Sequence, residues 1–142
     1  MKRISHFALW INRVVLCAAT LIFTMIGLRY VADPVGASAA TGVTLTSGLA
    51  VTTTRIGFGA FPLGFAIFSL VCLLSTRRLI TGVSLVATVI STAIVVRLFS
   101  IVADGVVPQS LRLFVPETVI LLLAFTGLLL EAARKQNNRE VA

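Results

Sequence analysis

Four long apolar stretches, separated by shorter polar segments, dominate the pattern of the chain. They cover about residues 10–32, 55–75, 79–103 and 110–131. A bilayer core about 30 Å thick needs about 20 helical residues to cross it. The pattern therefore predicts an all-α integral membrane protein, a four-helix bundle in which residues 1–142 form a single domain.

The start of the fourth stretch depends on a proline. A helix from Pro116 to Glu131 is only about 24 Å long, which is short for a bilayer crossing. Proline is tolerated inside membrane helices. We therefore favour a start near residues 108–110 with a kink at Pro116, which places Glu117 two turns inside the helix.

Three local signals concern the segment before the second stretch and the stretch itself. Asp33 followed by Pro34 is typical of a helix N-cap with proline at the first helical position, and it predicts a short interfacial helix over residues 34–41. The threonines at 52–54 are candidates to cap the second span. Pro62 lacks a backbone N–H and should kink that span.

The composition fits a membrane protein. Hydrophobic residues make up 58% of the chain and charged residues 12%, whereas a soluble domain is about 45–50% apolar and about 25% charged. The formal net charge is +7, from twelve Lys and Arg against five Asp and Glu. The basic residues form no stripe that a nucleic acid could follow, so no nucleic-acid partner is expected.

The positions of the basic residues predict the orientation. The segments on one side of the membrane carry most of them: Lys2, Arg3, Arg13, Arg77, Arg78, Arg134, Lys135 and Arg139. Basic loops stay on the cytoplasmic side. We therefore expect a multi-pass protein of the bacterial inner (cytoplasmic) membrane with both termini inside and residues 33–54 and 104–112 outside.

The first stretch also has features of a cleavable signal peptide. A basic start and an apolar run precede Ala37-Ser38-Ala39, which matches a cleavage site. Arg29 and further residues separate the apolar run from that site, which favours a retained span. Sequencing of the mature amino terminus distinguishes the two alternatives.

Charged residues near the outer ends of the spans need an explanation, because such residues cost free energy at membrane depth. Counting along the helices places these at one level: Arg29, Arg55, Arg97, Asp104 and Glu117, with Asp33 and Arg112 beside them. The guanidinium fork binds carboxylates bidentately. We predict an ion-paired network that joins the four helices. The alternatives are contact with headgroups and water, or an unpaired arginine that binds an anionic ligand.

Two kinds of helical stripe add candidate contact surfaces. On the second span the aromatic stripe is Phe58, Phe61, Phe65 and Phe68, which suits either a flat ligand such as a quinone or simple packing against helices and lipid. Small residues line two other spans: Thr20, Thr24 and Gly27 on the first, and Ser84, Thr88, Ser91 and Thr92 on the third. Such stripes allow close approach of helices within one chain or between two copies.

Candidate catalytic chemistry is sparse. Cys17 and Cys72 lie in apolar runs and form no CxxC pair, and His6 is the one histidine. These residues provide neither a metal-ligand set nor a nucleophile–base set. We expect no enzyme activity, no metal and no cofactor.

Several short patterns occur in order along about residues 14–131. They are Arg55-Ile56-Gly57-Phe58-Gly59 in the second span, Arg97 followed by Asp104-Gly105 in the third, and Pro116-Glu117 in the fourth. Together they resemble the small bacterial membrane family called domain of unknown function 4345. The resemblance implies a four-helix membrane protein without an established activity, and it adds no catalytic residue.

These observations favour a non-catalytic scaffold or an accessory subunit of another membrane protein. The alternative is a lipid, quinone or small-anion binding or transport protein that uses the outer arginine cluster. Expected partners are membrane lipids and either a second copy or another membrane protein. A ligand site predicts a cavity that reaches Arg97 and Glu117, whereas a scaffold predicts exposed stripes of small residues.

Overall fold

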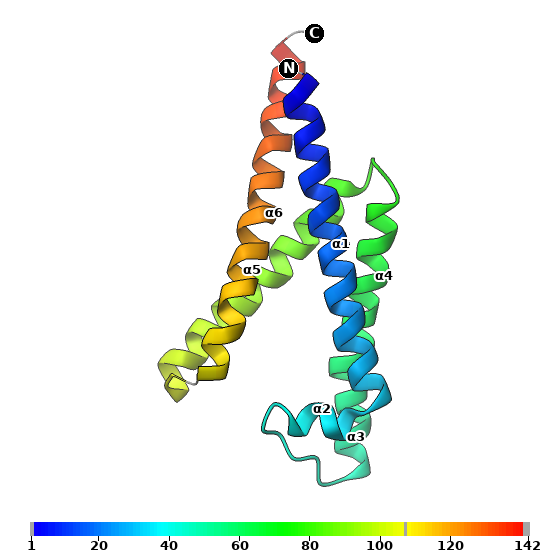
Figure 1. The fold of residues 1–142 in the computed structure, drawn as a ribbon, viewed down its shortest axis with the longest axis vertical. Helices are drawn as coiled ribbons and strands as arrows, with labels where there is room; N and C mark the ends of the chain where they lie inside the picture. Colours follow the sequence, from blue (N-terminus) through cyan, green and yellow to red (C-terminus); the bar gives the residue numbers. More distant parts are fainter. Residues whose placement is uncertain (1, 107, 141–142) are drawn as a thin grey trace. The chain divides into compact units, whose positions relative to one another are not determined.

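All the regular structure in the described residues is helical (Figure 1). The computed structural model describes the backbone of residues 2–106 and 108–140, and the side chains of residues 7–106 and 114–133. The element order is α1 (Lys2–Ala32), α2 (Pro34–Ala39), α3 (Gly48–Thr54), a π-helical segment η1 (Arg55–Ala60), α4 (Phe61–Leu73), α5 (Leu79–Asp104) and α6 (Pro108–Glu140). The predicted all-α class is confirmed.

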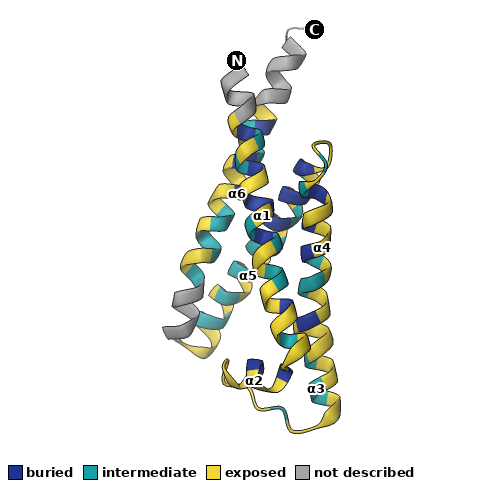
Figure 2. Ribbon diagram, turned by 45° about the vertical axis from the view of Figure 1, so that its right-hand side comes forward, coloured by how far each residue is buried: buried dark blue, intermediate teal, exposed yellow. Residues whose placement is uncertain are grey.

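Four helical stretches are long and apolar enough to cross a membrane: Phe7–Ala32, Gly48–Leu73, Leu79–Asp104 and Phe114–Ala133. Large apolar side chains point outward along them, for example Met25 at 71% and Leu129 at 69% exposure. Exposed residues occur all along the described parts of these helices (Figure 2). A lipid environment covers such surfaces without cost. The chain is therefore a multi-pass membrane protein with four candidate spans.

The second span begins earlier than the sequence pattern indicated. The start predicted at residue 55 is wrong, because helix α3 already begins at Gly48 and continues through η1 into α4. The expected caps at 52–54 are also wrong. The Ser47 hydroxyl accepts a hydrogen bond from the N–H of Ala50 at 3.1 Å, so Ser47 is the N-cap and the threonines lie inside the helix.

The irregularity that Pro62 predicts in the second span is the π-helical segment η1 just before it. The N–H of Phe61 donates to the carbonyl of Ile56, five residues back, which is the π-helical pattern. Proline in a regular helix lacks the donor and clashes with the carbonyl four residues back. The wider turn before Pro62 accommodates its ring without ending the helix.

Two other local predictions are confirmed. The Asp33 carboxylate caps α2 by accepting the N–H of Gly36 at 2.9 Å, with Pro34 at the first helical position. Helix α6 begins at Pro108 and runs through Pro116 without a break.

Gly105 ends α5 with a φ of 89°, a conformation that favours glycine.

The chain divides into two compact units, each described here by itself. The first unit combines Met1–Leu16 with Cys72–Ala142. In it α5 packs against α6, and α1 approaches both helices at glycines. A Cβ atom at Gly82 would lie 2.9 Å from Leu16 Cδ2, and one at Gly127 would meet Asn12 Oδ1. The missing side chains therefore allow α1 to lie close to α5 and α6.

The second unit is Cys17–Val71. Here α1 crosses η1 and α4 at a pair of glycines. A Cβ atom at Gly27 would lie 2.6 Å from Leu63 Cγ and 2.9 Å from the carbonyl oxygen of Gly59. Gly27 is buried at this crossing, so the end of the small-residue stripe predicted on the first span makes a contact within the chain.

Candidate functional site

A bidentate ion pair joins α5 to α6 in the first unit. Arg97 Nε donates to Glu117 Oε2 at 2.9 Å, and Arg97 Nη2 donates to Glu117 Oε1 at 2.6 Å. The two side chains are 20% and 21% exposed. Two parallel charge-assisted bonds fix both the distance and the orientation of the partners.

The helical hairpin explains why these two residues meet. Arg97 lies about 10 Å before the end of α5, and Glu117 lies about 14 Å after the start of α6, at a rise of about 1.5 Å per residue. Helices joined by a short connection run antiparallel, so the two side chains reach nearly the same level. Pro116 does not prevent this because α6 continues through it.

The other arginines predicted for the network have different surroundings. Arg55 Nε donates to the backbone carbonyl of Val31 at 3.1 Å. This carbonyl is in the last turn of α1, where carbonyl groups lack partners in their own helix. Arg55 therefore acts as a side-chain cap on the end of α1, a role that the charge pattern did not indicate.

Arg29 and Asp104 form no ion pair within the described part of the chain. Arg29 is exposed in the last turn of α1, where a positive charge interacts favourably with the helix dipole. Asp104 is exposed at the last residue of α5. The structure thus brings together Arg97 and Glu117, and the four-helix network stays a prediction. The side chain of Arg112 lies outside the described residues.

The aromatic stripe on the second span divides into two parts. Phe65 packs against Phe23 of α1 with ring centroids 5.8 Å apart, and Phe58 packs against Tyr30 at 5.4 Å. Phe61 and Phe68 are 64% and 42% exposed. Two of the four rings therefore hold α1 against η1 and α4 in the second unit.

Two threonines on α5, Thr88 and Thr92, use their hydroxyl groups in hydrogen bonds within the helix. Thr88 Oγ1 donates to the carbonyl of Ser84 and Thr92 Oγ1 to the carbonyl of Thr88, both at 2.9 Å. All three residues are exposed. The stripe thus presents small side chains, and its two threonine hydroxyls donate within the helix, which suits close contact with another helix.

Sequence reasoning missed a polar cavity at the other end of the first unit. It has a volume of about 440 Å³ and is lined by Leu9, Asn12, Thr76, Arg77, Leu79, Ile80, Thr81 and Glu131. Asn12 and Glu131 are only 1% and 4% exposed. Their positions were a signal: Asn12 shares one helical face with Ala8 and Val15, and Glu131 follows Gly127 by one turn.

Metal and thiol chemistry find little support in the described residues. No group of three or more His, Cys, Asp and Glu side chains converges among them. Cys72 is buried, with 2% exposure, and Cys17 is exposed on α1. The side chain of His6 lies outside the described residues. Cys72 therefore serves as a small core residue.

Comparisons with known proteins add no relative. No family model, no curated protein and no solved structure matches the chain. The resemblance to domain of unknown function 4345 therefore stays a prediction from its short motifs. By its structure the chain belongs to the class of all-α, multi-pass membrane proteins.

Proposed function

We propose that this chain is a non-catalytic scaffold or accessory subunit in the bacterial inner membrane, with both termini in the cytoplasm. The bidentate pair of Arg97 and Glu117 carries the proposal. Both carboxylate oxygens of Glu117 accept hydrogen bonds from the same guanidinium group. A residue that serves as a general base or a substrate ligand needs its lone pairs directed at the reacting molecule. The pair instead holds two apolar helices together.

The surface of α5 supports the scaffold interpretation. Ser84, Thr88 and Thr92 are exposed, and an apolar continuation on the same face includes Val95 at 64% and Phe99 at 71% exposure. Helices in membranes associate through small residues and close packing, because lipid offers no hydrophobic driving force between them. This face suits a second helix from another copy or from a partner membrane protein.

Site-specific photocrosslinking in intact membranes tests this function. A photoreactive side chain at Thr88 should give one discrete protein adduct, whose mass distinguishes a second copy from another membrane protein. Leu129 on α6 is 69% exposed and is the matched control. It should give much less adduct, because lipid surrounds it. Lipid adducts alone at Thr88, or the same protein adducts at both positions, would contradict the proposal.

The second candidate is an anion-binding or lipid-binding protein that uses the outer arginines. One observation favours it: Arg29 is exposed, and its side chain forms no hydrogen bond or ion pair with another residue in the described part of the chain. An arginine without a carboxylate is what a site for an anionic ligand requires. Loss of retained anionic lipid in an Arg29→Gln variant, measured by native mass spectrometry, would support this alternative.

A further inference from the structure

Helix α2 exposes apolar side chains and buries a polar one. Ser38 is 3% exposed, whereas Val35 is 51% exposed. The exposed positions of α2 are Val35, Gly36 and Ala39, and none of them has a polar side chain. A surface helix in water normally shows the opposite pattern, with polar residues on its outer face. The outer face of α2 therefore suits an apolar environment better than it suits water.

The same apolar character continues beyond α2. Residues 34–54 contain no charged side chain. The loop after α2 exposes Val43, at 52%, and the first turn of α3 exposes Leu49, at 78%. The neighbouring acid, Asp33, already accepts the N–H of Gly36 as the cap of α2. The segment therefore lacks the charges that would hold it in water or pair with a charged partner.

The backbone at the end of α2 is hydrogen-bonded within the segment. The N–H groups of residues 40–43 all donate to carbonyl groups of α2, at 2.9–3.1 Å. The hydroxyl of Thr41 donates to the carbonyl of Ser38 at 2.8 Å. Polar groups without partners cost free energy where water is scarce. Because these donors have partners, residues 34–43 can enter a less polar environment at little cost.

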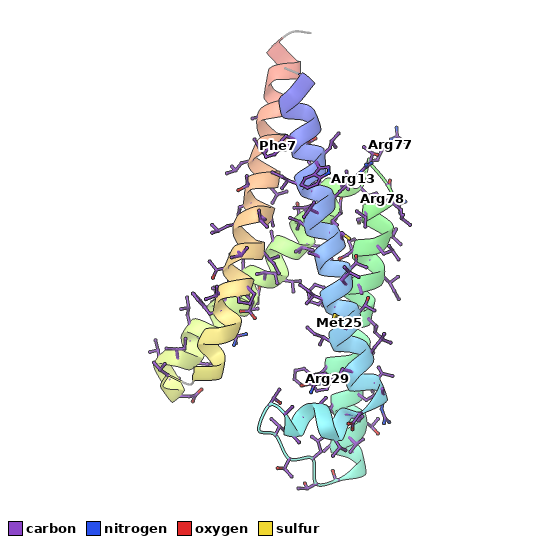
Figure 3. The ribbon with its side chains drawn as sticks, viewed as in Figure 1. Phe7, Arg13, Met25, Arg29, Arg77 and Arg78 are labelled. Atoms are coloured by element: carbon purple, nitrogen blue, oxygen red, sulfur yellow. The ribbon has the colours of Figure 1, made fainter. Side chains whose placement is uncertain are left out.

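The position of α2 in the second unit corresponds to the membrane surface. The first candidate span ends at Ala32 and the second begins at Gly48, and α2 contacts α3. Figures 1 and 2 show α2 running across the axis of α1 instead of continuing it. Arg29, which is exposed, lies at the same end of α1 (Figure 3). An arginine at the end of a span reaches headgroup level, so α2 lies at that level, along the membrane plane.

We infer that residues 34–43, called here the interfacial segment, bind the lipid surface and insert Val35 and Val43 at the boundary between headgroups and acyl chains. Interfacial helices bury their apolar face at this depth. The occupant is lipid because the exposed apolar surface is continuous with that of the spans, from Val31 in α1 to Leu49 in α3. The assignment is independent of the scaffold function, which depends on α5, and of which side of the membrane the segment faces.

Nitroxide labels on the full chain test whether these side chains face lipid. Single cysteines replace Val35, Val43 or Thr44, after Cys17 and Cys72 have been replaced by alanine, and the protein is placed in liposomes of phosphatidylethanolamine and phosphatidylglycerol. Oxygen concentrates in the lipid, whereas a charged nickel chelate stays in the water. Collisions with oxygen should exceed those with the chelate several-fold at positions 35 and 43. Thr44 is exposed and polar, and this control position should favour the chelate.

Three results of the labelling would overturn the assignment. Preferential collision with the nickel chelate at position 35 or 43 would place the segment in water. Shielding of these labels from both reagents would show that a second copy of the chain covers them. The same ratio of collisions at all three labelled positions would show that Val35 and Val43 have no preferred contact with lipid.

A charge on α2 should move the interfacial segment toward water. Val35→Asp places a carboxylate at an exposed position in the first turn of α2, where the helix dipole favours it, so the fold should persist. The label at position 43 should then become several-fold more accessible to the nickel chelate. Thr46→Asp, at an exposed position in the loop, is the control and should change this accessibility little. No effect of Val35→Asp, or equal effects of the two substitutions, would contradict the assignment.

Discussion

Arg97 on α5 and Glu117 on α6 form two parallel hydrogen bonds, Nε to Oε2 at 2.9 Å and Nη2 to Oε1 at 2.6 Å. Each side chain compensates the charge of the other between two apolar helices. A charge without its partner at this depth would have to reach headgroups or water. The pair therefore specifies how α5 and α6 are aligned as well as contributing to their stability.

The basic flanks predict a testable topology. A single cysteine introduced at Thr44, in the loop between α2 and α3, should react with a membrane-impermeant maleimide added to spheroplasts. A cysteine at Thr76, in the connection between α4 and α5, should react only after the membrane is permeabilised. Cys17 and Cys72 are first replaced by serine or alanine. Reversed labelling of the two sites would show the opposite orientation.

The crossing of α1 and η1 should be sensitive to one methyl group. A Gly27→Ala substitution places a Cβ atom 2.9 Å from the carbonyl oxygen of Gly59, and a backbone atom cannot rotate away. We expect the variant to lose about 1–3 kcal/mol, the usual cost of overpacking. The measurement is the melting temperature in detergent. Gly64→Ala is the matched control, because its Cβ atom would meet nothing within 4 Å; an equal loss there would contradict the close crossing.

The start of the second span depends on Ser47. Its hydroxyl accepts the N–H of Ala50, so Ser47→Ala should weaken the first turn of α3 by about 0.5–2 kcal/mol. Hydrogen exchange of the amides of residues 48–50 should become faster. Thr52→Ala should leave that exchange unchanged, because Thr52 lies inside the helix. Faster exchange in the Thr52 variant alone would restore the cap that the sequence pattern suggested.

Much of the fold followed from hydropathy and helix signals. The long apolar stretches predicted the four spans, and Asp33-Pro34 predicted the start of α2. The helix length needed to cross a bilayer predicted that α6 starts before Pro116. These features depend on local sequence and on the thickness of a bilayer. The start of the second span did not follow. Helix α3 begins at Gly48 and continues through a threonine-rich segment that resembles a polar loop.

The candidate site was predictable only in part. The pairing of Arg97 with Glu117 follows from their levels in an antiparallel hairpin. The capping of α1 by Arg55 does not, because it requires the crossing that Gly27 and Gly59 permit. The cavity lined by Asn12 and Glu131 depends on the packing of α1, α5 and α6, which a periodic pattern does not specify.

A double-mutant cycle on Arg97 and Glu117 tests the central claim most directly. The free energies of unfolding are compared for wild type, Arg97→Gln, Glu117→Gln and the double variant in one detergent. We predict that each single substitution lowers the free energy of unfolding. The loss in the double variant should differ from the sum of the two single losses by roughly 0.5–3 kcal/mol, as for residues in direct contact. If Glu117→Gln is as stable as wild type, or if the two losses simply add, the pair does not join α5 to α6.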